Sequence, residues 1–339
     1  MNSIYFNQYW TLTNAAALAW TTGLFIFFIA AFHASELYYP WLRIIKHSPQ
    51  RDTKPKTKDS KVLVELGKLY FLGSNAKRRK IEKDHSKALK YFKASSDLGN
   101  ALGQANLGIM HEQGLGGLPK NLPEAVNLYK KSAEQGNTLG QALLGNMYVD
   151  GLGGLPKDSK KAAKLFQTSA ERGDPLGMAF FGIMLRTGTG GLKMNEAEAS
   201  KFFRTSAKKG NSWAQVYLGD MYERGVAGLA KDPEKAVVLY RASSYQGNPM
   251  AMAFLGRMYQ NGEGGLSENT AQALELCSAS SERGCSFGQG YLGEMYEHGI
   301  GVPVNTDKAI QLYQRSVNQG LDLYKENLQK LLQKKNTVS

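Results

Sequence analysis

The fold is decided by three adjoining stretches, AQVYLGDMY at residues 214–222, ERGVAGLA at 223–230 and PEKAVVLYRASSYQGN at 233–248. In the first and third stretches, apolar residues recur at the spacing of an amphipathic helix. Gly225 is suited to end the first helix, because glycine tolerates the backbone conformation at a helix C-terminus. Asp232 and Pro233 favour the start of the second, as N-cap and first helical residue. The three stretches therefore predict a helix–turn–helix hairpin.

This hairpin pattern recurs at a fixed interval along the chain. The glycine that follows a hydrophobic residue in the first helix occurs at Gly67, Gly108, Gly145, Gly182, Gly219, Gly256 and Gly293. The first interval is 41 residues and each later one is 37. A second series with the same period, until a final interval of 36, is Gly99, Gly136, Gly173, Gly210, Gly247, Gly284 and Gly320. Two markers with one period indicate a repeat array.

The consensus of the repeats is Ala-x-x-x-Leu-Gly-x-Met-Tyr-x-x-Gly, followed by Lys-Ala-x-x-Leu-Tyr-x-x-Ser-Ala-x-x-Gly-Asn. Leu-Gly is kept, for example, at Leu144-Gly145 and Leu292-Gly293. This pattern resembles the Sel1-like repeat family, relatives of the tetratricopeptide repeats. The resemblance implies an all-α, right-handed α-solenoid of about seven Sel1-like helix–turn–helix repeats over residues 61–320. Apolar residues spaced between charges predict a C-terminal capping helix and tail over 321–339.

The N-terminal region differs in composition from the repeats. Residues 1–35 contain no Asp, Glu, Lys or Arg, and the run LTNAAALAWTTGLFIFFIAAF begins at Leu12. As a helix this run would be roughly 31 Å long, which matches the hydrocarbon core of a bilayer. The pattern predicts an interfacial N-terminus over 1–11, one transmembrane helix over 12–38 and a basic juxtamembrane linker over 39–60. A cleaved signal peptide fits less well, because no basic residue precedes the run.

The positive charge is concentrated after this apolar run. The net charge is +13, and residues 36–100 hold 16 Lys or Arg against 7 Asp or Glu, whereas residues 101–339 hold 26 against 22. A nearly neutral body disfavours nucleic acid as a partner. The residues expected at a membrane surface are Arg43, Lys46, Lys54, Lys56, Lys58, Lys77, Arg78, Arg79 and Lys80. The positive-inside rule then predicts a single-pass membrane protein with its repeats in the cytosol or mitochondrial matrix. The alternative location is the endoplasmic-reticulum membrane.

The sequence predicts no enzyme, no catalytic residue, no metal site and no cofactor. None of the five histidines forms an HxxxH or HExxH spacing. Cys277 is expected in the core and Cys285 in the turn after it, too far apart for a disulfide. The glycine-rich turns lack the phosphate-loop motif and recur in successive repeats, so a nucleotide site is disfavoured.

Repeat arrays commonly bind other molecules along the surface formed by their first helices. Positions that vary between repeats are therefore candidate contacts, although they are equally compatible with plain solvent exposure. The candidate partner-binding residues on the expected concave face are Lys68, Gln104, Gln141, Asn146, Gln215, Asp220, Arg257, Gln289 and Glu294. Glutamine interleaved with methionine suits a protein partner better than a small molecule.

We therefore expect a membrane-anchored scaffold or adaptor that binds partner proteins next to the bilayer, which it contacts through its N-terminal helix and basic residues. A structural accessory subunit of a large membrane complex, for example a respiratory one, is an alternative. The family resemblance adds a third hypothesis, an adaptor in endoplasmic-reticulum quality control. The sequence does not predict the oligomeric state.

Overall fold

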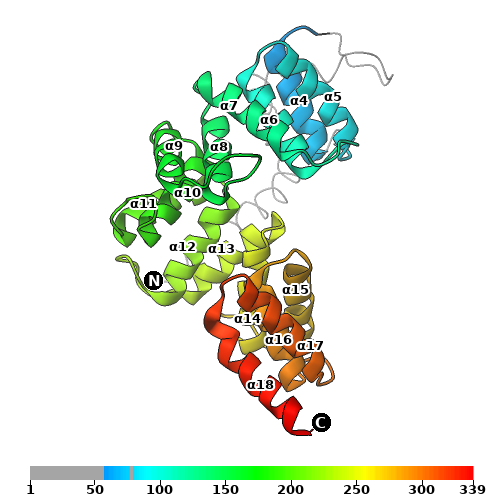
Figure 1. Ribbon diagram of the computed structural model, residues 1–339, viewed down its shortest axis with the longest axis vertical. Coiled ribbons are helices and arrows are strands. Elements are labelled where there is room, and N and C mark those ends of the chain that lie inside the picture. The colour runs from blue at the N-terminus through cyan, green and yellow to red at the C-terminus, as the bar shows by residue number, and fades with distance from the viewer. Residues whose placement is uncertain (1–56, 77–78, 339) are drawn as a thin grey trace, which may run out of the picture. The chain divides into compact units, whose positions relative to one another are not determined.

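The computed structural model describes residues 57–76 and 79–338, and these residues form α-helices, one 3₁₀ helix and a two-stranded β-hairpin (Figure 1). The chain divides into two compact units, Met1–Leu98 and Gly99–Ser339. The described residues of the first unit form one antiparallel helix pair, and those of the second unit form a series of such pairs. In each pair the first helix carries the Leu-Gly glycine and the second helix follows it. Because a single hairpin cannot bury its apolar face alone, stacking of successive hairpins forms the core of such an array.

The described part of the first unit is one helix pair with a β-hairpin between the helices. Its elements are α4 (Ser60–Leu72), β1 (Ser74–Ala76), β2 (Arg79–Ile81) and α5 (His85–Asp97). The strands pair antiparallel, with Ser74 opposite Ile81. The hairpin lies in the 41-residue interval, where four extra residues separate the two helices, so the expectation of an entirely helical chain missed it.

The second unit contains six helix pairs in succession (Figure 1). The first helices are α6 (Ala101–Gln113), α8 (Thr138–Asp150), α10 (Pro175–Thr187), α12 (Ser212–Arg224), α14 (Pro249–Asn261) and α16 (Ser286–His298). The second helices are α7 (Leu122–Glu134), α9 (Ser159–Glu171), α11 (Glu196–Lys208), α13 (Pro233–Tyr245), α15 (Thr270–Glu282) and α17 (Thr306–Asn318). Each second helix packs against its own first helix, and the second helices α7 to α15 also pack against the first helix of the following pair.

Local side-chain chemistry sets the helix boundaries. In α12 the Asn211 side chain accepts a hydrogen bond from the Ala214 backbone N–H at 3.0 Å, and Gly225 ends the helix with a φ of 67°. Asparagine or aspartate caps α4 to α15 and α17 in the same way, whereas Cys285 at the start of α16 makes no capping hydrogen bond. These caps satisfy backbone N–H groups that have no partner within the helix.

The repeated Leu-Gly glycine makes room for an aromatic ring of the second helix. A Cβ atom at Gly219 would lie 2.6 Å from Cε1 of Tyr240, and one at Gly182 would lie 2.8 Å from Cε1 of Phe203. Both rings are fully buried. In the sixth repeat the ring is replaced by buried Cys277, whose sulfur faces Gly256. The glycine is therefore required by packing inside each hairpin.

The C-terminal part of the chain covers the last hairpin. A 3₁₀ turn, η1 (Asp322–Tyr324), leads into α18 (Lys325–Val338), and both pack against α17. Tyr324 is 1% exposed, and its ring occupies the space that a Cβ atom at Gly290 would take. Tyr324 also stacks on Tyr313, with ring centroids 5.2 Å apart. Residues beyond the last repeat thus contribute to its core.

The predicted localisation as a single-pass membrane protein is contradicted, because no helix within residues 57–76 and 79–338 is long and apolar enough to cross a membrane. The predicted segments 1–11 and 12–38, and most of the linker 39–60, lie outside the described residues. Most of the residues expected at a membrane surface also lie outside them, namely Arg43, Lys46, Lys54, Lys56, Lys77 and Arg78. Lys58 is exposed just before α4, and Arg79 and Lys80 belong to β2.

Candidate partner-binding surface

Two rows of half-buried residues run across the first helices of the second unit, and we call them together the first-helix face. One position after the repeated glycine, the row consists of Ile109, Asn146, Ile183, Asp220, Arg257 and Glu294. Four positions after it, the row consists of Glu112, Val149, Arg186, Glu223, Gln260 and Glu297. Residues three or four positions apart on a helix share one side, so both rows belong to one surface. Its composition changes from repeat to repeat.

Ion pairs on this face join neighbouring repeats. Arg186 of α10 contacts Asp220 of α12, with Nη1 2.7 Å from Oδ2. Arg257 of α14 contacts Glu223 of α12 in the same manner, and its Nη1 lies 2.9 Å from Oε2 of Glu263. In both cases the second row of one repeat meets the first row of the next. These half-buried pairs fix the charged side chains in defined positions.

Three of the predicted contact residues form hydrogen bonds inside their own hairpins. Gln104, Gln215 and Gln289 are buried, and each accepts a hydrogen bond at its side-chain oxygen from a glutamine at the end of the second helix. The donors are Gln135 at 2.7 Å, Gln246 at 2.8 Å and Gln319 at 2.8 Å. Each glutamine pair therefore links the first helix of a hairpin to the end of its second helix.

Gln141 differs from the other three glutamines. Its side-chain oxygen is buried without a hydrogen-bond partner among the described residues. The second helix of this hairpin is followed by Arg172 instead of glutamine, and the Arg172 guanidinium donates to the carbonyl oxygen of Gly136. Among the described residues, the first-helix glutamine is therefore hydrogen-bonded in the hairpins whose second helix is followed by a glutamine, and it is unpaired in the hairpin where Arg172 takes that place.

The remaining predicted residues lie on first helices with part of their side chains exposed. Asn146, Asp220, Arg257 and Glu294 lie on the first-helix face. Lys68 lies on α4 of the first unit, where its Nζ is 2.9 Å from the Glu65 carboxylate. The sequence analysis missed the second row, including Arg186 and Glu223. A detectable signal was present, because opposite charges recur 34 residues apart in the pairs of Arg186 with Asp220 and Glu223 with Arg257.

Glu294 stands apart within the charged rows. Its carboxylate makes no hydrogen bond or ion pair within residues 57–76 and 79–338. Burial is the main reason that the pKa of Glu294 is raised above its ordinary value, with Glu297 adding to the effect and His298 and Arg257 opposing it. The Glu294 oxygens are not among the buried atoms that lack a partner, so solvent still reaches the carboxylate, and its partial burial makes the charged form less favourable.

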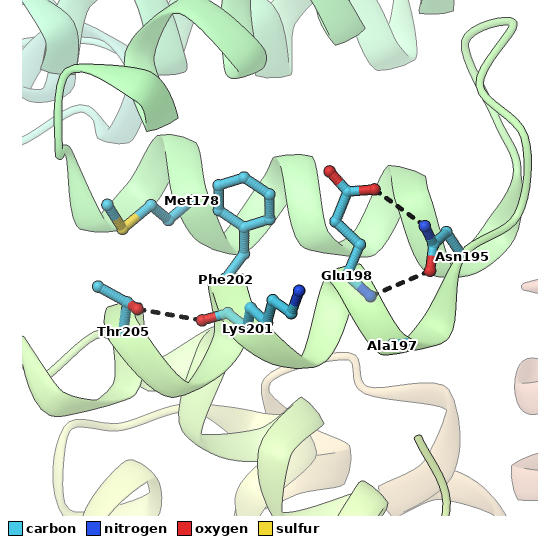
Figure 2. A pocket seen from close by; sticks show the side chains of 7 residues that line it. All are labelled: Met178, Asn195, Ala197, Glu198, Lys201, Phe202 and Thr205. Carbon is cyan, nitrogen blue, oxygen red and sulfur yellow. Dashed lines mark hydrogen bonds between the residues drawn. The ribbon is translucent and has the colours of Figure 1, made fainter. Parts of the chain in front are cut away.

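A pocket of about 410 Å³ lies beside α11 (Figure 2). It is lined by Met178 of α10 and by Asn195, Ala197, Glu198, Lys201, Phe202 and Thr205. Figure 2 shows that its polar groups bond within their own helix: Asn195 Nδ2 donates to Glu198 at 2.9 Å, and Thr205 Oγ1 donates to the carbonyl of Lys201 at 3.0 Å. These contacts cap and brace the helix. The described residues contain no group of three or more His, Cys, Asp or Glu arranged to hold a metal ion.

The comparisons with known proteins agree with this architecture. A family model described as Sel1 repeat matches residues 60–100, 101–137, 138–174, 175–211, 214–248, 249–285 and 286–321. The chain therefore belongs to the Sel1 repeat family. The matched segments coincide with the seven helix pairs, so the predicted seven repeats are confirmed. The right-handed sense of the solenoid stays a prediction.

Solved structures of repeat proteins are similar to this chain. A Sel1 repeat protein from Oxalobacter formigenes is 26% identical, with a TM-score of 0.53, and the match covers 77% of this chain and 97% of that protein. A protective antigen of uropathogenic Escherichia coli strains that displays an SLR fold is 31% identical, with a TM-score of 0.44. That match covers 79% of this chain and 56% of the antigen, so this chain spans about half of its length. No curated protein matches the chain.

Proposed function

We propose that this Sel1 repeat protein is a scaffold or adaptor that binds partner proteins along the first-helix face of its second unit. The fold itself generally mediates protein–protein interaction and is not generally enzymatic. The observation that carries the proposal is the contrast between constant and variable positions. Met110, Met147, Met184, Met221, Met258 and Met295 are all buried at one position of the repeat. The position directly before this methionine belongs to the first-helix face and changes between aliphatic, amide, acidic and basic residues.

A protein partner suits this face better than a small molecule does. Ligand pockets bury most of a small molecule in a cleft. The first-helix face instead presents side chains from the first helices of six successive pairs, which suits an extended chain or a second protein surface. Half-buried ion pairs hold its charged groups in place before binding, so less conformational freedom is lost when a partner docks.

Site-specific photo-crosslinking tests this proposal. A photoreactive amino acid is placed at Asn146 or Ile183 on the first-helix face, and at exposed Asn127 or Lys164 on the second helices as matched controls. Crosslinked products in cells of the source organism are then identified by mass spectrometry. We expect the same partner proteins from both first-helix positions and from neither control. Equal products from all four positions, or products from the second-helix positions alone, would reject the first-helix face.

A further inference from the structure

Carboxylates outnumber basic groups at the C-terminal end of the first-helix face. Glu223, Glu263 and Glu294 surround the single guanidinium of Arg257. Glu223 is bonded to Arg257 and to the Tyr240 hydroxyl, and Glu263 to Arg257 and Asn261. Residues 249–321 hold seven Asp or Glu against four Lys or Arg, in a chain whose net charge is +13. The local charge is therefore opposite to that of the whole chain.

A buried hydroxyl beside Glu294 also lacks a partner. Tyr324 is 1% exposed, and its hydroxyl has no hydrogen-bond partner among the described residues. The Tyr324 ring lies over Gly290, with Cε2 and Cζ as its nearest atoms, and Gly290 and Glu294 are one helical turn apart on the same side of α16. Burial is the main reason that the pKa of Tyr324 is raised above its ordinary value, and the charge of Glu294 adds to this effect.

These two groups have complementary needs. A half-buried carboxylate is stabilised by a cation, and an unpaired phenol oxygen accepts a hydrogen bond from a cationic N–H group. Arg257 does not meet the need of Glu294, because its guanidinium is bonded to Glu223 and Glu263. A bare metal ion is disfavoured, since no suitable group of three ligands exists among residues 57–76 and 79–338. A long cationic side chain delivers both a charge and several donors.

We propose that Glu294 binds a lysine or arginine side chain of a partner polypeptide, with Tyr324 beside it and Glu223 and Glu263 supplying further negative potential. This assignment rests on the proposed function, because it names the chemistry of the partner at one point of the first-helix face. Ion pairing in a half-buried site is stronger than at a fully exposed one, and it orients the bound chain. The occupant is thus a basic segment of another protein.

Fluorescence anisotropy with defined peptides tests the assignment. The full chain is titrated into labelled Gly-Arg-Gly-Arg-Gly, with Gly-Glu-Gly-Glu-Gly as the reversed-charge probe. The test variant is Glu294→Gln, and Glu282→Gln on the exposed surface of α15 is a control with the same change in net charge. We expect saturable binding of the arginine peptide that weakens at least about fivefold in Glu294→Gln and less than twofold in Glu282→Gln, consistent with the strength of a charge-assisted hydrogen bond.

Three results would overturn the assignment: no saturable binding of the arginine peptide, equal weakening in both variants, or equal affinity for the two peptides. Glu294→Gln is isosteric, and circular dichroism of both variants checks that the fold is kept. The crosslinking experiment separates this inference from the proposed function. Partner crosslinks at Asn146 and Ile183 that persist in Glu294→Gln, without arginine-dependent binding, would retain the scaffold and reject the cationic contact. Loss of first-helix specificity in the crosslinks would reject the scaffold itself.

Discussion

Cys285 is the one N-cap residue from α4 to α17 whose side chain makes no capping hydrogen bond. Asparagine at the equivalent position of α14, Asn248, accepts from the Ala251 backbone N–H at 3.2 Å. We expect Cys285→Asn to raise the free energy of unfolding by about 1 kcal/mol, because it supplies the missing acceptor. Urea denaturation measures the change, with Cys285→Ala as a control that should give no gain. An unchanged stability in Cys285→Asn would contradict this account of the helix start.

Ala227 is the non-glycine residue with positive φ among the described residues, at 55°. The equivalent positions of other repeats are glycines, such as Gly153 at 63° and Gly264 at 63°. Left-handed backbone costs a non-glycine residue about 1–2 kcal/mol, and the greater freedom of glycine in the unfolded chain offsets part of that. We expect Ala227→Gly to stabilise the protein by about 0.5 kcal/mol and to raise its melting temperature. Gly225→Ala is the matched control, because it places alanine at another position with positive φ and should destabilise the protein. A loss of stability in Ala227→Gly as large as that in Gly225→Ala would show that Ala227 is not strained.

Glu294 gives a pH dependence with a definite sign. Burial raises its pKa above the ordinary value of 4.5, so the folded state binds the proton more tightly than the unfolded state does. This contribution to stability is present below pH 4.5 and is lost as the pH rises through the folded-state pKa. We therefore expect wild type to lose stability relative to Glu294→Gln as the pH rises from 4.5. Urea midpoints across a pH series measure this, and a constant difference would contradict it.

Within each hairpin, the packing of a ring on a glycine sets how closely the two helices approach. At Gly182 a methyl group would lie 2.8 Å from the Phe203 ring. We expect Gly182→Ala to destabilise the protein by about 1–3 kcal/mol, as overpacked cores do. The double variant with Phe203→Leu should recover part of the loss, because the smaller side chain leaves room for the methyl group. Additive losses in denaturation experiments would show that the ring and the glycine are not coupled.

The sequence was sufficient to predict the helix pairs because their determinants are local. Asp232, Pro233 and Gly225 act within a few residues of the helix ends that they define. The β-hairpin between α4 and α5 was missed, because its three-residue strands lack an alternating apolar pattern. The roles of Gln104 and Gln289 were missed for another reason. Their partners lie 30 or 31 residues away, and a polar side chain looks the same in sequence whether it faces water or another helix.

The candidate surface was predicted in part. Placing Asp220, Arg257 and Glu294 together followed from the repeat period alone, since equivalent positions of stacked repeats form rows. Their pairing with Arg186 and Glu223 depends on how successive hairpins pack, which the period does not specify. The buried Tyr324 hydroxyl, which has no hydrogen-bond partner among the described residues, comes from beyond the repeats. Contacts between repeats therefore required the structure.

The C-terminal cover of the second unit, η1 and α18, stabilises the last hairpin. In a repeat array each hairpin contacts only its neighbours, so an uncovered last hairpin would expose its core. We expect Tyr324→Ala to cost about 3 kcal/mol, the usual penalty for removing a buried aromatic ring, and to increase hydrogen exchange chiefly in α16 and α17. Leu323→Ala, at a side chain that is 62% exposed, is the control and should change little. Uniform loosening from α6 to α17 would contradict neighbour-by-neighbour stability.

The central claim is that partner proteins bind the first-helix face. Hydrogen–deuterium exchange of the full chain, alone and in complex with a crosslink-identified partner, tests it most directly. The account predicts that the partner slows exchange in successive first helices, α10, α12, α14 and α16, with little change in α9, α11 and α13. Protection confined to the second helices, with the first helices unchanged, would contradict it.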